Sequence, residues 1–235
     1  MPVSEESAPA IRRFTPAELL GPLNESEAKN APSTLWVAGR IELLRTSPRV
    51  SIVGSRNATA LGLRRAEKLA RILAKNGIVV VSGLAQGIDT AAHRAAMKEG
   101  GATIAVLGTP LNRVFPRENA ELQDEIMRKH LAVSQFPPGG PVERGNFIMR
   151  NRTMALLVNA SVIVEAEERS GARSQGWEAL RLGRPLFLLR SIVERTDLTW
   201  PKEMLDYGAE VLAGEEELLG AVPRTDDETL AAVAF

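Results

Sequence analysis

Short apolar runs alternate with longer amphipathic stretches along most of the chain. The apolar runs are rich in Val, Ile, Ala and Leu, which is typical of strands buried on both faces of a sheet. Strands are therefore expected at 50–53, 78–82, 103–107, 132–134, 161–165 and 185–189. The stretches between them predict helices over 61–76, 89–99, 119–129, 146–159 and 174–182.

The helical pattern is clearest over 61–76. Apolar residues such as Leu69 and Leu73 recur on one face, basic residues such as Lys68 occupy the rest, and Gly77 follows as a helix stop. Because strands separated by helices pair in parallel, the predicted fold class is α/β. We expect a doubly wound, mostly parallel, Rossmann-like sheet with helices on both faces.

The two ends of the chain lack this regular alternation. Residues 1–33 are rich in Ser, Pro, Glu and Ala, with short helical possibilities at 16–20 and 25–30. The apolar stretch 35–44 is expected to add an edge strand or to cover the sheet, and 197–219 to form a helix, a short strand and a last helix. The predicted organisation is a flexible N-terminal arm (1–33), an extended Rossmann-like domain (34–220) and an acidic C-terminal tail (221–235).

Composition narrows the class of protein. A chain of 235 residues with 44% hydrophobic content can bury the core of one large domain. It has no cysteine, which excludes disulfides, thiolate nucleophiles and cysteine metal sites. No stretch approaches the roughly 18 apolar residues of a membrane helix, and the first residues lack an apolar leader. We therefore expect a cytoplasmic protein with no membrane partner.

Charge is unevenly distributed, although the formal net charge is zero. Residues 203–235 hold nine acidic residues and one basic residue, so the rest of the chain is basic. Of the 29 basic residues 23 are arginines, whose planar guanidinium suits bidentate contact with phosphate. The pattern favours a polyanionic partner for the body of the chain, and a plain solvated surface is the alternative.

The loops that follow the strands are where a ligand is expected, because ligands of open parallel sheets bind beyond the carboxyl ends of the strands. Four such loops stand out: "GSRNATALG" from Gly54, "SGLAQGID" from Ser82, "GTPLNRVFPREN" from Gly108 and "EAEERSGARSQG" from Glu165. None has the glycine spacing of a dinucleotide or Walker loop, and the second strand does not end in an acid. No cofactor is expected.

The first loop offers a general anion site. Gly54, Ser55 and Arg56 precede a helix, whose N-terminal N–H groups and dipole favour a phosphate that a guanidinium can hold. The alternative is that Arg56 pairs with a surface carboxylate and that the glycine only turns the chain.

The second loop raises the question of catalysis. Asp89 and His93 lie four residues apart and share a helix face, as an acid–base pair would. Neither a nucleophile nor a third partner is evident. Asp89 also suits a helix N-cap that bonds the N–H of Ala91 or Ala92, with His93 packed against the loop. We expect no catalytic residue and no metal site here.

The stretch "NFIMRNRTMALL" brings Phe147, Arg150, Asn151 and Arg152 near the start of a helix. Arginines beside an exposed aromatic ring suit single-stranded nucleic acid, because the phosphates take the charge and a base takes the ring. The alternative places the ring in the core and the arginines in salt bridges.

Taken together, these motifs resemble the DNA-processing protein A family (DprA, also called Smf). The likeness runs in order through "LWVAGRIELL", "SIVGSR", "GIVVVSGLAQGIDTAAHRAAMKEGGATIAVLG", "FPREN", "FIMRNR", "VIVEAEERSGAR", "ALRLGRPLF" and "LDYGAEVL", over residues 35–219. The resemblance implies an extended Rossmann domain that binds single-stranded DNA in a basic pocket. It also implies a homodimer that helps load the RecA recombinase during natural transformation.

The resemblance further implies a DNA- and phosphate-binding set: Gly54, Ser55, Arg56, Ser82, Gly83, Ala85, Gly87, Asp89, His93, Phe147, Arg150, Asn151, Arg152, Ser170 and Gly171. The chain departs from the family pattern at Asn112, Gln135, Ile148 and the pair Arg190–Ser191, as a divergent, compact member would.

The function expected is that of a non-enzymatic, DNA-binding recombination mediator. Two alternatives stay open for the same pocket, a nucleotide sensor and a nucleoside-monophosphate hydrolase. The glycine-rich loop of phosphoribohydrolases is absent, and the acid nearest to such a role is Glu178.

Overall fold

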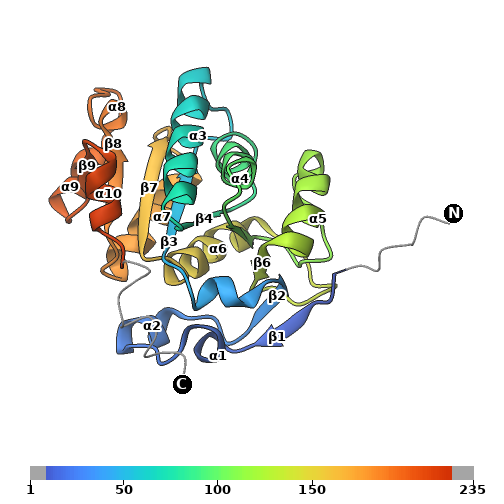
Figure 1. Cartoon of the computed structure of the whole chain (residues 1–235). Helices are drawn as coiled ribbons and strands as arrows, with labels where there is room; N and C mark the ends of the chain where they lie inside the picture. The colour runs from blue at the N-terminus through green and yellow to red at the C-terminus, as the bar shows by residue number, and fades with distance from the viewer. Residues whose placement is uncertain (1–8, 224–235) are drawn as a thin grey trace, which may run out of the picture.

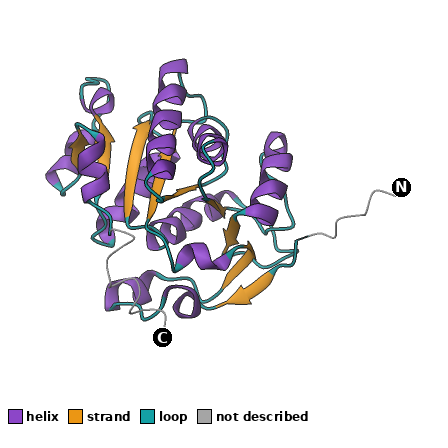
Figure 2. Ribbon diagram, viewed as in Figure 1, coloured by secondary structure: helices purple, strands orange, loops and turns teal. Residues whose placement is uncertain are grey.

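The computed structural model describes residues 9–223 as a nine-stranded sheet flanked by helices (Figures 1 and 2). The strands follow the order β1-β2-β6-β5-β4-β3-β7-β8-β9. Their bounds are β1 Arg12–Phe14, β2 Leu35–Gly39, β3 Arg49–Gly54, β4 Val79–Ser82, β5 Thr103–Leu107, β6 Leu131–Ser134, β7 Ala160–Glu165, β8 Leu186–Leu189 and β9 Glu210–Leu212. From β6 to β9 all neighbours pair in parallel, whereas β1 and β2 add an antiparallel edge.

Helices cover both faces of the sheet. Their bounds are α1 Pro16–Leu20, α2 Glu25–Asn30, α3 Ala60–Lys75, α4 Ile88–Lys98, α5 Ala120–Lys129, α6 Arg144–Leu156, α7 Gly171–Arg181, α8 Arg190–Val193, α9 Trp200–Asp206 and α10 Glu215–Gly220, with short 3-10 turns at Ile41–Leu44 and Arg117–Asn119. Helices α3, α4 and α5 pack on one face and α6 and α7 on the other. The predicted fold class is therefore confirmed.

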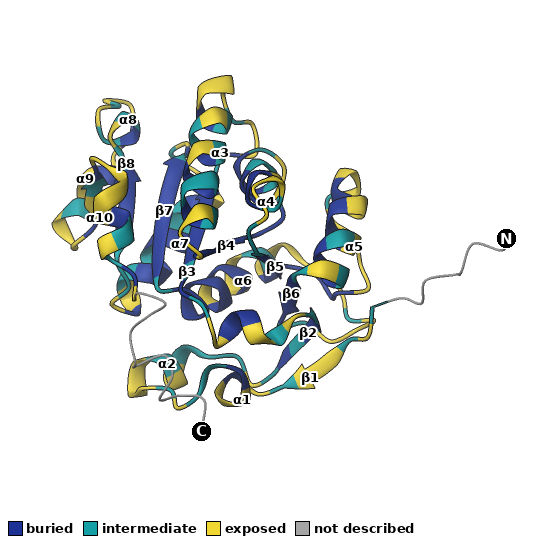
Figure 3. Ribbon diagram, in the orientation of Figure 1, coloured by how far each residue is buried: buried dark blue, intermediate teal, exposed yellow. Residues whose placement is uncertain are grey.

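Strands β3 to β8 are buried on both sides, as their largely apolar sequences require, whereas the edge strands β1 and β9 are partly exposed (Figure 3). In β4, Val79 and Val81 face the core beneath α6 and α7, while Val80 faces the core beneath α3 and α4. This alternation follows from the two-residue period of a strand. No helix within residues 9–223 is both long and apolar enough to span a bilayer.

The segment expected to be an arm lies against the domain over the part that the structure describes. Strand β1 pairs with β2, Leu19 is fully buried, and Glu27 forms an ion pair with Arg184. Burial of an apolar side chain together with an ion pair gives these residues a fixed place despite their polar composition. Residues 1–8 of the predicted arm and residues 224–235 of the predicted tail lie outside the described residues.

The order of the strands defines one special position along the sheet. The chain runs from β3 outward through β4, β5 and β6, and then returns to place β7 on the other side of β3. The loops that leave β3 and β7 therefore diverge to opposite faces. In open α/β sheets a crevice forms at such a switch point, beyond the carboxyl ends of the strands.

Candidate functional site

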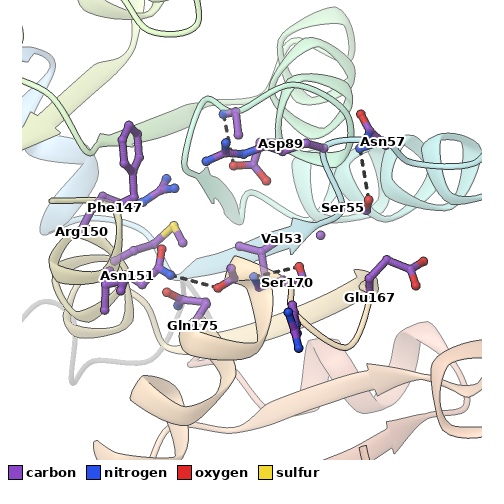
Figure 4. Close-up of a pocket in the computed structure, with 18 residues that line it drawn as sticks. Val53, Ser55, Asn57, Asp89, Phe147, Arg150, Asn151, Glu167, Ser170 and Gln175 are labelled. Atoms are coloured by element: carbon purple, nitrogen blue, oxygen red, sulfur yellow. Dashed lines mark hydrogen bonds between the residues drawn. The ribbon is translucent and has the colours of Figure 1, made fainter. Parts of the chain in front are cut away.

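A cavity of about 420 Å³ occupies this switch point (Figure 4). Its walls come from the loop after β3, the start of α4, helix α6 and the start of α7. Phe147 and Arg150 lie on one side of it, and Ser55 and Asn57 on the other. The volume is in the range of ordinary ligand pockets.

The loop after β3 is anchored to its neighbours through the backbone. The pairing of β3 with β7 shifts register after Val53, so that Gly54 lies opposite Glu165. The N–H of Ser55 donates to the carbonyl of Glu165 at 2.7 Å, and the N–H of Ile88 donates to the carbonyl of Ser55 at 3.2 Å. Irregular pairing of this kind re-aims the chain at a strand end, here toward the cavity.

Arg56 lies at the tip of that loop and is exposed. Its guanidinium carbon is 5.7 Å from the centre of the Phe147 ring, and that ring is 5.3 Å from the ring of Phe115. Arg56 forms no ion pair within the described part of the chain. The mouth of the cavity therefore presents a free cation beside two aromatic rings.

The loop after β4 rests on the loop after β3. Gly87 has φ +75°, and a Cβ there would lie 2.3 Å from the carbonyl oxygen of Ser55. A glycine is required because both the backbone conformation and the contact exclude a side chain. Ser82 is buried, and its hydroxyl donates to the carbonyl of Ile52, so it holds the strand end and does not face the cavity.

Asp89 organises the same loop from within the first turn of α4. The N-cap of the helix is Gly87, so the expected N-cap role of Asp89 is wrong. Its Oδ2 instead accepts from the N–H of Gly83 at 3.1 Å and of Ala85 at 3.3 Å. Burial raises the pKa of this carboxyl, against the opposing effect of the Arg150 charge.

Arg150 forms the floor of the cavity. Only 7% of the residue is exposed, and Nη1 donates to the carbonyl of Val106 at 3.0 Å. A Cβ on Gly83 would fall 1.3 Å from Nη1, so the guanidinium lies directly on the backbone of the second loop. Burial lowers the pKa of Arg150, and Asp89 counteracts that effect. Its Nε has no hydrogen-bond partner among residues 9–223, which leaves one buried donor unsatisfied there.

The opposite wall is the N-terminus of α7. Ser170 is its N-cap, with Oγ accepting from the N–H of Ala172, so the helix begins at Gly171 and not at residue 174 as predicted. Asn151 donates from Nδ2 to the carbonyl of Gly171 at 3.1 Å, which ties α6 to α7. Arg169 lies on the rim, exposed and without an ion pair in the described residues.

The N-terminus of α3, which the sequence suggested for a phosphate, is already occupied by a carboxylate. Glu165 accepts from the N–H of Thr59 at 2.8 Å and from its hydroxyl at 2.6 Å. A carboxylate there complements the helix dipole. The positive end that faces the cavity belongs to α7 instead.

Three residues of the predicted set lie away from the cavity, in addition to Gly87 beneath it. Ser82 and His93 are buried in the core, where the His93 ring contacts Thr103. Arg152 lies on the other face of α6 from Arg150, and its Nε is 3.4 Å from Oε2 of Glu178. The reason is helical phase, since residues two apart in a helix are about 200° apart around its axis.

The other residues of the predicted set lie together. The cavity is lined by Gly54, Ser55, Arg56, Ala85, Asp89, Phe147, Arg150, Asn151, Ser170 and Gly171, and Gly83 lines a smaller hollow beside it.

Sequence reasoning missed Arg169, Gln175 and Glu167 in the cavity and Phe115 in the adjoining hollow. Arg169 and Phe115 each lie next to a predicted motif, and that adjacency was the available signal. Glu167 also pairs with Arg195 at 2.9 Å. Within residues 9–223, no three His, Asp or Glu side chains gather as a metal site would require.

Known protein families and curated proteins include clear matches to this chain. The family model of DNA recombination-mediator protein A matches residues 16–223. Protein Smf from Synechocystis is 37% identical over 85% of this chain, which spans 52% of that protein. DNA processing protein DprA from Streptococcus pneumoniae is 37% identical over 84% of this chain and 70% of its own length. The chain thus spans about half the length of the first relative and 70% of the length of the second.

Solved structures agree in fold. The X-ray structure of DNA processing protein A from Streptococcus pneumoniae matches with a TM-score of 0.77 and 33% identity, over 89% of this chain and 74% of that one. DNA processing protein A from Helicobacter pylori, described with a single-stranded DNA binding mode, matches with a TM-score of 0.75 and 28% identity, over 89% and 94%. The match of the family model over most of the chain, together with these relatives, shows that this protein belongs to the DNA recombination-mediator protein A family, DprA or Smf.

Proposed function

We propose that this chain binds single-stranded DNA in the cavity at the carboxyl ends of β3 and β7, without cleaving it. The observation that carries the proposal is the pair of exposed arginines, Arg56 and Arg169, which line the same cavity without ion pairs in the described residues. Free guanidiniums at a concave site are suited to phosphate oxygens. The Helicobacter pylori relative with its single-stranded DNA binding mode supports the same conclusion.

The strand backbone would run between the two arginines. Arg56 and Arg169 each neutralise a phosphate, and the N–H of Gly171 at the start of α7 adds a donor on the opposite wall. Arg150 adds positive charge from beneath without leaving its buried place. These contacts are with the backbone, so they hold a strand without selecting its sequence.

Phe147 supplies the contact with a base. The ring lies at the mouth beside Arg56, and Phe115 contacts it from the adjoining hollow. A base stacked on an aromatic ring contributes about 1–3 kcal/mol whatever its identity. A duplex keeps its bases stacked inside, so this arrangement favours the single strand.

The remaining residues of the site position these groups. Asp89 and Gly87 fix the loop after β4 against the loop that carries Arg56. Asn151 fixes α7 against α6. None of them needs to touch DNA, yet the loss of any one would move the cations apart.

The catalytic alternative lacks a suitable acid in the cavity. Glu178 lies outside it, bound by Arg152 at 3.4 Å and by Arg181 at 3.7 Å. Asp89 accepts two backbone N–H bonds, and Glu167 pairs with Arg195. A carboxylate held in this way is poorly placed to activate water. Incubation with nucleoside monophosphates should therefore release no free base.

The test is the fluorescence anisotropy of labelled oligo-dT across a range of salt concentrations. Arg56→Ala and Arg169→Ala should each weaken binding about tenfold, equivalent to about 1.4 kcal/mol. Each should also reduce the slope of log K against log salt by about 0.7, the value for one phosphate on a single strand.

The matched control is Arg152→Ala. It removes one exposed guanidinium from α6, two residues from Arg150, but outside the cavity. It should bind oligo-dT like the parent. Equal binding by all variants, or an equal loss in Arg152→Ala, would contradict the proposed site. Tight binding of dTMP with no advantage for oligo-dT would favour the nucleotide sensor instead.

Two further proposals rest on the family alone: that the chain forms a homodimer, and that it helps load RecA onto DNA. Light scattering of the purified chain tests the first. The second predicts that the chain accelerates RecA filament formation on oligo-dT, and that Arg56→Ala reduces the acceleration at equal concentration.

A further inference from the structure

A second cavity, of about 430 Å³, lies where β8 and β9 end beside α3. It shares no lining residue with the cavity at β3 and β7. Strands β8 and β9 pair with each other, and α10, which follows β9, contacts α3 (Figure 1). Its lining joins one face of α3, the turn from β8 into α8 and the turn from β9 into α10.

One part of this lining is strongly basic. Arg65 donates from Nη1 to the hydroxyl of Ser191 at 2.7 Å, which draws the guanidinium toward the end of β8. Lys68 and Arg190 are exposed and have no ion pair in the described residues. Among the described residues of this lining Glu215 is the one acid, so the cations outnumber it by three to one.

The rest of the lining is apolar. Leu69 and Ile72 follow Arg65 on the same face of α3, four and seven residues along, and Leu189 and Leu212 face them from β8 and β9. The spacing matches one stripe of a helix. The cavity therefore has an apolar wall and a cationic end within the space of one small ligand.

We propose that this second cavity binds a small amphipathic anion, a phosphate or carboxylate group carried on a short apolar body. The guanidiniums and the Ser191 hydroxyl suit the oxygens of such a group, and the leucine and isoleucine side chains suit its hydrocarbon part. A neutral ligand would leave the excess of positive charge in this lining uncompensated. A nucleic-acid strand would find no aromatic ring here on which to stack a base.

The experiment uses the full chain labelled at its Ile and Leu methyl groups, titrated with four probes and followed by NMR. The probes are inorganic phosphate, n-butyl phosphate, pentanoate and n-butanol. We expect n-butyl phosphate or pentanoate to shift the methyl resonances of Ile72 and Leu212. The better of the two should bind about tenfold more tightly than inorganic phosphate, because it buries methylenes that phosphate lacks, and about tenfold more tightly than n-butanol, because it carries a charge that n-butanol lacks. The tighter of the two anions identifies the group recognised.

Variants locate the site. Lys68→Ala and Arg190→Ala should each weaken binding of the better probe at least fivefold, because both side chains are exposed cations at the cavity. Arg64→Ala removes an exposed charge from α3 outside the cavity and should bind like the parent. Thermal unfolding of each variant checks that the fold is kept, and oligo-dT binding should be unchanged in all three.

Several results would overturn the proposal. One is the absence of methyl shifts with either amphipathic anion. Another is equal affinity for inorganic phosphate and n-butyl phosphate, which would leave the apolar wall without a role. Equal weakening in Arg64→Ala would reduce the effect to general surface charge. Because oligo-dT binding is measured on the same variants, this outcome is independent of the function proposed for the first cavity.

Discussion

His93 should make the fold sensitive to acid, because it is buried in one defined neutral form. The hydroxyl of Thr103 donates to the carbonyl of Val80 at 2.7 Å, which uses its only proton. The contact of 2.6 Å between His93 Nδ1 and Thr103 Oγ1 must therefore be a bond that Nδ1–H donates. Nε2 then carries the lone pair and has no hydrogen-bond partner in the described part of the chain. Protonation would place a charge and an unpaired N–H in the core.

The size of the effect follows from the pKa. Burial, with smaller effects from His130 and Arg150, lowers the pKa of His93 from 6.5 to about 3. Between these values the unfolded chain binds a proton that the folded chain does not, so stability falls as the pH falls. The loss is about 1.4 kcal/mol per pH unit. Between pH 7 and pH 5 it amounts to roughly 2 kcal/mol of unfolding free energy.

The assay is urea unfolding of the parent and of His93→Gln at pH 7 and pH 5, followed by tryptophan fluorescence. The variant will be less stable at pH 7, because the new side chain replaces a well-packed ring. The quantity that matters is the change between the two pH values, which should be about 2 kcal/mol smaller in the variant. Other titrating groups, including His130 and Asp89, are common to both proteins and cancel in this difference.

An independent readout is the C2–H resonance of each histidine. That of His93 should not titrate above pH 4, because its neutral form persists to about pH 3. A His93 resonance that titrates near pH 6.5, or an equal loss of stability in parent and variant, would refute the argument from burial and tautomer.

Two further predictions concern the loops and their anchors. Gly83→Ala should lower the free energy of unfolding by about 1–3 kcal/mol, because its Cβ would fall 1.3 Å from Nη1 of Arg150. The control is Gly171→Ala, whose Cβ meets nothing within 4 Å among the described residues and which should change the free energy of unfolding by less than about 0.5 kcal/mol. Urea unfolding compares the two variants, and equal stability would show that Arg150 can move aside. Glu165→Ala should cost about 1–2 kcal/mol through the lost bonds to Thr59, with oligo-dT affinity nearly unchanged. A large loss of oligo-dT affinity in Glu165→Ala would mean that the N-terminus of α3 takes part in binding.

Much of the fold could be predicted because its signals are local. Uniformly apolar runs separated by amphipathic stretches allow few arrangements other than a covered parallel sheet. The predicted strand at 103–107 matches β5 in both bounds. The prediction at 50–53 is one residue short of β3 at each end, and the other four predicted strands differ from the structure by one residue at their first position. The start of α7 was predicted at residue 174, three residues too late. Its true start depends on the cap that Ser170 makes and not on apolar periodicity.

The approximate place of the site was predictable for the same reason. Ligands of open α/β sheets bind beyond the carboxyl ends of the strands, so the loops from Gly54, Ser82 and Glu165 were candidates before any coordinates. In the structure these three loops meet at one cavity. The loops meet because they all follow strands of one parallel sheet, and the order of strands and helices along the chain is enough to predict this.

The detailed composition of the site was not predictable, because it depends on how each helix is rotated and on contacts between distant residues. Arg150 and Arg152 are equivalent in the sequence, yet packing of α6 turns the first into the cavity and the second toward Glu178. The bonds between Glu165 and Thr59 join residues 106 positions apart. Local sequence thus determined the elements, their order and the edge of the sheet where a ligand belongs. Only packing selected the side chains that reach it, because helix rotation and long-range pairing minimise the free energy of the whole core rather than of any one segment.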